Sequence, residues 1–153
     1  RVLEKAEGHY FLFLNNDLEL APDCVVQLVD LLESDQHIGA AIPKILYHSD
    51  GQEPSLNNSA MINSFGVLVN YTGIACPNLV DQQDKDELPL TETACGGIFM
   101  FRREVYEQVG GFDEDLFLYH EDHDLSWKIR FTGIYWNSWH AGNDSIFRNF
   151  RSW

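Results

Sequence analysis

The chain has 153 residues, 44% of them hydrophobic, which is the size and composition of a single globular domain with a substantial core. Twenty-four acidic and ten basic residues give a formal net charge of −14 at pH 7. This balance argues against a nucleic acid as partner, because phosphate backbones are bound by clustered Lys and Arg side chains. It suits cation binding, and an anionic substrate would need a bridging metal ion or a local basic spot.

The cysteines are few and widely spaced: Cys24, Cys76 and Cys95, with no CxxC pair. They predict neither a structural zinc site nor a disulfide framework, so we expect a reducing compartment, the cytoplasm. The sequence has neither a signal-peptide pattern nor an apolar run long enough to span a bilayer. It also lacks an initiator methionine, and we expect Arg1 to lie inside a larger domain.

Residues 9–14 form a continuous apolar run, which predicts a buried strand of a largely parallel sheet. The run ends at Asn15, Asn16 and Asp17, where such a strand opens to solvent. Ligands bind at the carboxyl ends of strands in open α/β sheets, so these residues are candidate ligand-binding groups. Asn and Asp also favour turns, and a simple turn explains the same residues.

The next part of the chain has the pattern of one helix followed by strands. Apolar residues at i, i+3, i+4 and i+7 predict a helix over residues 21–34. Residues 38–46 are typical of a second strand, in which Pro43 indicates an edge or an irregular position. Residues 61–71 fit one strand or a hairpin, and the acidic stretch 76–92 fits a surface loop.

A glycine pair marks the strand that follows. Residues 94–101 are typical of a strand, and Gly96 and Gly97 near its start indicate close approach of a backbone or a ligand, or else a simple bulge. A short helix over residues 102–108 should end at a second glycine pair. Strand–helix units in sequence, with a mixed tail, predict an α/β fold.

The most distinctive stretch is residues 117–128, Phe-Leu-Tyr-His-Glu-Asp-His-Asp-Leu-Ser-Trp-Lys. Its acids and histidines lie between apolar and aromatic residues, which predicts a helix start that directs Glu121 and Asp122 into a pocket. The partial positive charge of a helix N-terminus favours carboxylates there. Three interpretations stay open: a capped structural helix start, a general base and a metal site.

A final strand over residues 134–139 delivers His140 to its end. With Asp17, this histidine is a candidate ligand of a divalent cation, because carboxylate oxygens suit Mg²⁺ and Mn²⁺ and an imidazole favours Mn²⁺. Taken alone, His140 also fits a packed or hydrogen-bonded histidine at the margin of the core.

Four motifs occur in order: GHYFLFLNNDLELAPD (residues 8–23), GGIFMFRR (96–103), VGGFDE (109–114) and FLYHEDHDLSWK (117–128). Together they resemble family 2 glycosyltransferases, in particular a bacterial rhamnosyltransferase-like subgroup, and they cover most of the chain. The resemblance implies the GT-A fold, a nucleotide-binding α/β sandwich with a mixed sheet flanked by helices. The chain would be one partial domain, with the family's first, nucleobase-binding strand and helix before Arg1.

The resemblance also implies roles for single residues. Asn15, Asn16 and Asp17 stand where the family keeps its Asp-x-Asp motif, so that Asp17 would bind the metal ion that bridges the donor diphosphate. The pair Glu121 and Asp122 matches the catalytic acidic motif of the family. Asp122 would be the catalytic base.

The remaining implied roles concern the metal ion and the sugars. His140 resembles a histidine that some members use as another metal ligand, and Gly96 and Gly97 would lie near the acceptor and the donor sugar. The implied reaction is an inverting transfer, dependent on Mg²⁺ or Mn²⁺, from a UDP- or dTDP-sugar to a saccharide or lipid-linked saccharide. It would serve cell-surface polysaccharide synthesis at the inner face of the cytoplasmic membrane, with a homo-oligomer as one assembly state.

Two other functions stay open at this point. The acids between residues 113 and 124 also suit a non-catalytic module that binds calcium or a protein partner, although the spacing of an EF-hand is absent. An inactive piece of an enzyme would show the same motifs.

Overall fold

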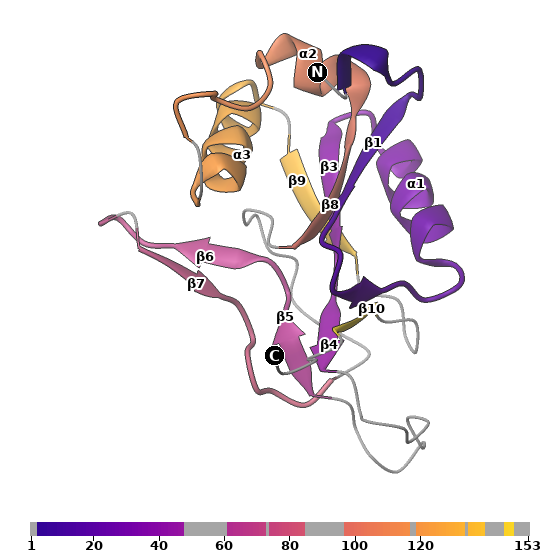
Figure 1. Cartoon of the computed structure of the whole chain (residues 1–153), viewed down its shortest axis with the longest axis vertical. Coiled ribbons are helices and arrows are strands. Elements are labelled where there is room, and N and C mark those ends of the chain that lie inside the picture. Colours follow the sequence, from indigo (N-terminus) through magenta and orange to yellow (C-terminus); the bar gives the residue numbers. More distant parts are fainter. Residues whose placement is uncertain are drawn as a thin grey trace.

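The structure is a computed structural model, which describes residues 3–47, 61–72, 74–84, 97–116, 119–133, 135–139 and 146–148. In this part of the chain, helices cover both faces of a four-stranded sheet (Figure 1). In chain order the elements are η1 (Leu3–Lys5), β1 (Tyr10–Leu14), β2 (Leu18–Glu19), α1 (Cys24–Ser34), β3 (Ile38–Pro43), β4 (Ile45–Tyr47), β5 (Ile62–Ser64), β6 (Val67–Val69), β7 (Ala75–Pro77), β8 (Ile98–Arg102), α2 (Arg103–Gln108), α3 (Glu121–Phe131), β9 (Tyr135–Trp139) and β10 (Ile146–Arg148).

The main sheet is mixed, with the strand order β1-β8-β3-β9. β8 is antiparallel to both of its neighbours, whereas β3 and β9 are parallel to each other. The expected α/β class and mixed sheet are confirmed, but the expectation that the first strand belongs to a largely parallel sheet is wrong. A continuous apolar run indicates that a strand is covered, and it carries no information on the direction of the neighbouring strand.

Each face of the main sheet has its own helices, because adjacent side chains of a strand point to opposite faces. Met100 of β8 belongs to a buried cluster with Leu28 of α1. The next residue, Phe101, belongs to the cluster on the other face, with Leu125 and Ile129 of α3. Figure 1 accordingly shows α1 and α3 on opposite sides of the sheet. Leu125 and Ile129, which are four residues apart in α3, therefore both face the core.

The predicted strand over residues 38–46 is two strands that belong to different sheets. β3 lies inside the main sheet and ends at Pro43, and β4 begins two residues later. Pro43 is therefore at an irregular position and not in an edge strand, because its missing N–H ends the ladder where the chain leaves the sheet. Between the strands, Lys44 is only 3% exposed, and its Nζ lies 2.5 Å from Oδ1 of Asp84.

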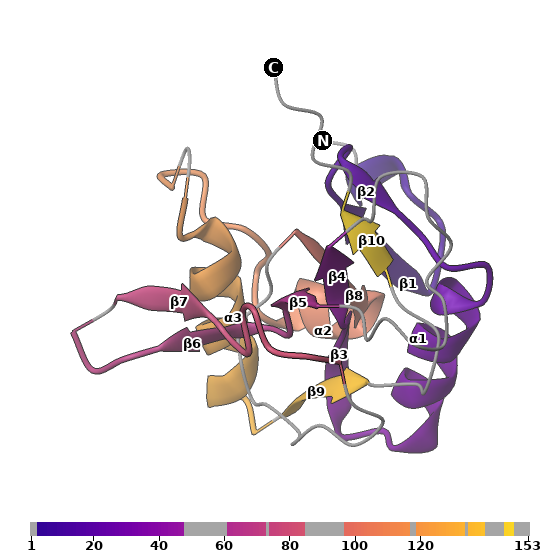
Figure 2. The same cartoon turned by 90° about the horizontal axis from the view of Figure 1, so that it is seen from below.

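Residues 61–71 form neither one strand nor a hairpin. β5 pairs with β4, whereas β6 pairs with β7, and Gly66 turns the chain between them with a φ of 72°. The predicted surface loop from residue 76 is likewise corrected, because its first residues belong to β7. The β6–β7 pair projects from the same side of the molecule as α3 (Figures 1 and 2).

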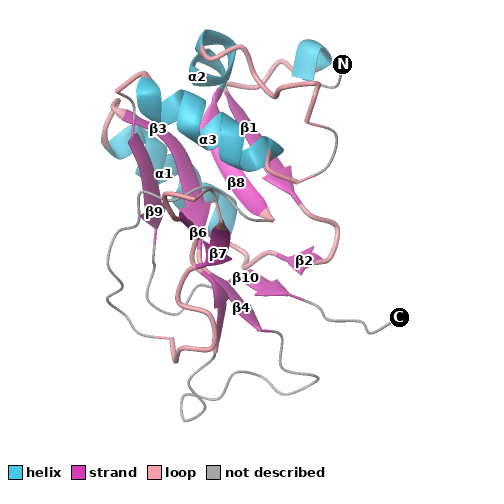
Figure 3. Cartoon of the chain, turned by 90° about the vertical axis from the view of Figure 1, so that its left-hand side faces the viewer, coloured by secondary structure: helices cyan, strands magenta, loops and turns pink. Residues whose placement is uncertain are grey.

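The second sheet lies beyond the carboxyl end of β1. Its strand order is β2-β10-β4-β5, and β10 is antiparallel to β2 and parallel to β4. Figure 3 shows β2, β4 and β10 below the main sheet, so the segment 15–17 lies where the two sheets meet. Among the described residues, no helix has the length and apolar character that crossing a lipid bilayer requires.

The end of α2 provides a matched pair of glycine substitutions. Gly110 and Gly111 have φ values of 79° and 73°, so an alanine at either position is strained by about 1–2 kcal/mol. A Cβ on Gly110 meets nothing within 4 Å, whereas one on Gly111 would lie 2.5 Å from the Tyr106 ring. That ring is stacked on Phe101 at 5.2 Å and cannot move without disturbing the core.

We predict that Gly110→Ala lowers the free energy of unfolding by about 1–2 kcal/mol. Gly111→Ala should lower it by about 1–3 kcal/mol more, because it also overpacks the core. Urea denaturation of both variants measures the difference. Equal losses would contradict the packing of Tyr106 against the core.

Candidate active site

A cavity of about 200 Å³ lies at the junction of the two sheets. It is lined by Asn15, Asp17, Leu18, Ile45, Asn63, Ser64, Val67, Pro77 and Gly97. Its polar side chains are amides, a hydroxyl and one carboxylate, which can accept hydrogen bonds from a sugar or ligate a hard cation. The structure thus brings together three of the residues that the sequence predicts, Asn15, Asp17 and Gly97.

Gly97 holds the start of β8 against the residue that follows β1. The backbone N–H of Asn15 donates to the Gly97 carbonyl oxygen at 2.8 Å. Gly97 has a φ of 75°, and a Cβ there would lie 3.4 Å from Nδ2 of Asn15. The register between β1 and β8 runs without a shift from Tyr10 to Leu14, so the close-approach interpretation of this glycine is favoured over a bulge.

The other predicted ligand-binding residues are placed differently. Asn16 is exposed and does not belong to the lining of the cavity, whereas Asp17 is half-buried. Gly96 and His140 lie outside the described residues, so their predicted roles stay predictions. Within the described ranges, no group of three or more His, Cys, Asp or Glu residues is arranged to hold a metal ion. The oxygen donors around Asp17 nevertheless fit the chemistry of Mg²⁺ or Mn²⁺, which take few protein ligands when phosphate oxygens supply the rest.

Glu121 and Asp122 lie in the first turn of α3, as the sequence predicts. The two residues before them, Tyr119 and His120, have left-handed φ values of 66° and 69°. Such a conformation is unfavourable for residues other than glycine and is found most often at functional sites. His120 makes no side-chain capping hydrogen bond, but Oδ1 of Asp122 accepts the backbone N–H of His123 at 2.8 Å within the first turn, so the structural interpretation of this helix start stays open beside the catalytic one.

The carboxyl group of Asp122 is half-buried, with 23% of its side chain exposed. Burial raises its pKa above the ordinary value, and the nearby charge of Glu121 acts in the same direction. The charge of His123 and its backbone N–H, which donates to Oδ1 of Asp122 at 2.8 Å, oppose this rise without cancelling it. A carboxylate whose pKa is raised is a stronger proton acceptor than an ordinary aspartate, which suits a general base.

Asp122 and the cavity belong to separate elements on one side of the molecule. Neither Glu121 nor Asp122 belongs to the described lining of the cavity. The β6–β7 pair contributes Val67 and Pro77 to that lining, and Figures 1 and 2 show this pair on the same side as α3. The helix that carries the candidate base therefore lies on the same side of the molecule as the β6–β7 pair, which contributes to the lining of the candidate cation site.

The sequence did not predict roles for His120, His123 and Asn63 in this region. His123 has a buried Nε2, and Glu121 a buried Oε2, that have no hydrogen-bond partner within the described residues. Buried polar atoms of this kind mark places where a ligand or water binds. The contact between His120 and His123 depends on the left-handed backbone of His120, for which the sequence holds no local signal. Asn63 reaches the cavity from a distant strand, for which the sequence holds no local signal.

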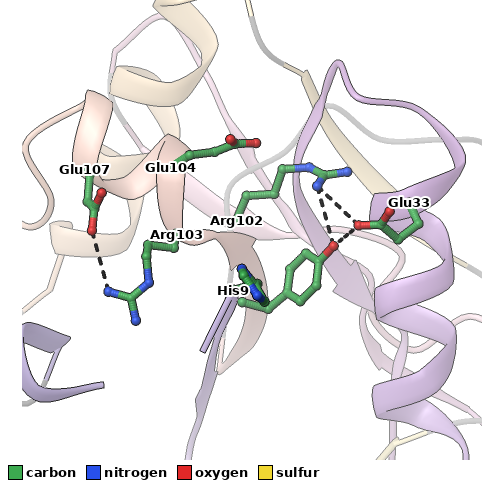
Figure 4. A pocket seen from close by; sticks show the side chains of 7 residues that line it. His9, Glu33, Arg102, Arg103, Glu104 and Glu107 are labelled. Carbon is green, nitrogen blue, oxygen red and sulfur yellow. Dashed lines mark hydrogen bonds and ion pairs between the residues drawn. The ribbon is translucent and has the colours of Figure 1, made fainter. Parts of the chain in front are cut away.

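A larger cavity of about 370 Å³ lies at the other end of β1 and β8 (Figure 4). It is lined by His9, Tyr10, Glu33, Arg102, Arg103, Glu104 and Glu107. Arg102 pairs with Glu33 at 3.3 Å and donates to the Ile38 carbonyl oxygen, and Arg103 donates to the Gly8 carbonyl oxygen. These guanidinium groups fasten α1 and the segment before β1 to the sheet. We therefore place the candidate active site at the first cavity and at the start of α3.

Two family models match the chain. The family model described as "Glycosyl transferase family 2" matches residues 1–110, and the model "N-terminal domain of galactosyltransferase" matches residues 85–148. The first match includes Asn15, Asp17 and Gly97, and the second includes Gly97 and Asp122. A search of the curated proteins found no match to the chain.

The raised pKa of Asp122 predicts that this residue destabilises the fold at neutral pH. Because the folded state holds the proton more tightly than the unfolded state, stability falls as the pH rises from 3.8 through the folded-state pKa. Asp122→Asn keeps an acceptor for the His123 N–H and removes the buried charge. The variant should therefore be more stable than the wild type at pH 7, and this difference should disappear below pH 3.8.

Asp35→Asn is a control with the opposite sign. The backbone N–H and the side chain of His37 lower the pKa of Asp35, so its charge stabilises the fold above pH 3.8 and the variant should lose stability there. Thermal unfolding of both variants between pH 3 and pH 8 measures the two effects. A loss of stability at pH 7 in Asp122→Asn would contradict the burial and charge described for this carboxylate.

Proposed function

Because the chain belongs to glycosyl transferase family 2, and so has the GT-A fold, we propose that it carries out an inverting, metal-dependent sugar transfer from a nucleoside diphosphate sugar to an acceptor hydroxyl. The observation that carries this proposal is a half-buried carboxylate with a raised pKa at a strained helix start, Asp122. The helix that carries it, α3, lies on the same side of the molecule as the β6–β7 pair, which contributes Val67 and Pro77 to the lining of a cavity with oxygen donors.

In the proposed reaction, Asp122 accepts the proton of the acceptor hydroxyl while the acceptor oxygen attacks the anomeric carbon. Attack from the face opposite the leaving diphosphate inverts the configuration. Glu121 acts beside it, because burial raises the pKa of Asp122 and the negative charge of Glu121 adds to this rise. A base with a pKa closer to neutrality is more effective, provided that it stays ionised at the working pH.

The donor diphosphate would lie in the cavity at the junction of the sheets. Asp17 would hold Mg²⁺ or Mn²⁺, with His140 as a further ligand, and the bound cation would offset the charge of the leaving diphosphate. Asn15 and Asn16 belong to the same segment, and Gly96 and Gly97 would leave room for the sugars. The oxygen donors of the cavity and the absence of a Cβ at Gly97 support this assignment.

The substrate assignment is part of the same proposal. It names a UDP- or dTDP-sugar as donor and a saccharide or lipid-linked saccharide as acceptor, in cell-surface polysaccharide synthesis at the inner face of the cytoplasmic membrane. It rests on the likeness of the motifs to the rhamnosyltransferase-like subgroup. The negative charge of the chain supports a metal-bridged anionic donor over direct binding by basic residues.

We predict that Asp17→Asn weakens binding of Mn²⁺ together with UDP or dTDP at least about tenfold, or about 1.4 kcal/mol. The amide keeps the shape of the side chain and removes the charge that attracts the cation. Asp30→Asn, an exposed position on α1, is the matched control and should bind as the wild type does. Isothermal titration of the purified chain measures both, and equal affinities in all three proteins would exclude Asp17 as a ligand.

We predict that Asp122→Asn lowers the turnover number about 100- to 10,000-fold, which is the range of a general base. Nucleotide binding should be unchanged, because the substitution is in α3 and not in the lining of the cavity. Release of nucleoside diphosphate from a panel of UDP- and dTDP-sugars measures turnover, and inverted linkage in the product checks the stereochemistry. Full turnover in this variant would refute the assignment of the base.

A further inference from the structure

His123 contacts one oxygen of Asp122 twice. Its backbone N–H donates to Oδ1 at 2.8 Å, and its Nδ1 lies 3.2 Å from the same oxygen. The imidazole is itself 17% exposed, so its neighbours restrict its rotation. A carboxylate held by two groups on one oxygen cannot turn freely about its Cβ–Cγ bond. His123 therefore restricts the direction in which Asp122 faces.

A second imidazole continues the arrangement toward solvent. Nδ1 of His120 lies 3.3 Å from Nδ1 of His123, and the ring centroids are 5.3 Å apart. One proton on Nδ1 of His123 can be shared between Oδ1 of Asp122 and Nδ1 of His120, whereas protons on both nitrogens would repel. Because His120 is exposed, the two imidazoles extend from the half-buried carboxylate to the surface of the protein.

The left-handed backbone at the start of α3 makes this arrangement possible. Tyr119 and His120 have positive φ values, which are unfavourable for residues other than glycine. With this backbone, the imidazole of His120 lies against that of His123. The remaining acid of this turn, Asp124, pairs instead with Lys128 at 2.7 Å. Among the described residues, His123 and Glu121 act on Asp122 with their charges, in opposite directions.

We propose that His123 is a positioning residue for Asp122: it directs the carboxylate toward the acceptor hydroxyl and keeps it ionised, with His120 as the exposed end of the same hydrogen-bonded group. This inference rests on the proposed function, because it assumes that Asp122 is the base. The orientation is the part that affects the rate, since a displacement of about 1 Å in a reacting group can reduce turnover about 100-fold.

The chain contains a matched control for this contact. At the end of α1, the backbone N–H and Nδ1 of His37 lie 2.8 and 2.9 Å from Oδ1 of Asp35, which repeats the contacts of His123 with Asp122. That pair is exposed and lines neither of the two cavities. His37→Leu therefore removes the same kind of contact at a place where it has no role in the reaction.

The decisive experiment follows the side-chain carboxyl carbons of the aspartates by NMR while the pH is changed, in the purified chain. In His123→Leu the titration of Asp122 should move to higher pH, because a stabilising charge is lost. In His37→Leu only the titration of Asp35 should move. His123→Gln keeps a hydrogen-bond donor without a charge, so it should show the same upward shift as His123→Leu and tests the proposal if the leucine variant does not fold.

Turnover gives the second readout. His123→Leu should lower the turnover number about 10- to 100-fold with little change in KM, and His123→Gln should restore part of the loss while the acid limb of the pH profile stays displaced upward. An unchanged titration of Asp122 in both His123 variants would overturn the proposal. The NMR titration needs no substrate, so its result is decisive even if the chain transfers no sugar. Failure of the proposed positioning by His123 can therefore be distinguished from failure of the proposed function.

Discussion

The structure depends on the insertion of β8 between β1 and β3, antiparallel to both. β8 runs from the candidate site at one end of the sheet to Arg102 and Arg103 at the other end. At the first end, Gly97 approaches Asn15 closely enough for a backbone hydrogen bond of 2.8 Å. At the other end, Arg102 binds the carbonyl oxygens of Leu32 and Ile38 and so fixes α1 against the sheet. The same strand thus positions the cavity and stabilises the layer behind it.

The start of α3 illustrates the conflict between stability and function. Two residues in left-handed conformations and a half-buried carboxylate with a raised pKa all oppose folding at neutral pH. The buried residues Leu125 and Ile129 of the same helix compensate by packing on the main sheet. Strained backbone and half-buried charges beside a well-packed core are typical of functional sites, because catalysis or binding requires groups that lower the stability of the fold.

Much of the fold could be predicted from the sequence because its signals are local. The spacing of apolar residues defines α1 and α3, and glycines with positive φ mark the end of α2. Strand direction and sheet membership could not be predicted, because they depend on pairing partners far along the chain. Pro43 indicates an irregularity within residues 38–46, but the sequence does not show that the strands on either side of Lys44 belong to different sheets.

The candidate site divides in the same way. Asp17, Gly97 and Asp122 are found from motifs, because each lies at the end of a regular element. Asn63 and Ser64 line the cavity because β5 pairs with β4, and no sequence pattern predicts this pairing. The contact between His120 and His123 depends on a backbone conformation that is unusual for histidine. Side-chain chemistry is thus easier to predict than the neighbours that tune it.

The central claim is that carboxylates from two separate elements serve a single cleft, one for a cation and one for a proton. A crystal structure of the chain with Mg²⁺ and a nucleoside diphosphate tests it most directly. The account predicts a cation about 2.1 Å from a carboxylate oxygen of Asp17, with the carboxyl group of Asp122 open to the space beyond the diphosphate. A cation bound elsewhere, or protein atoms that separate Asp122 from that space, would contradict it.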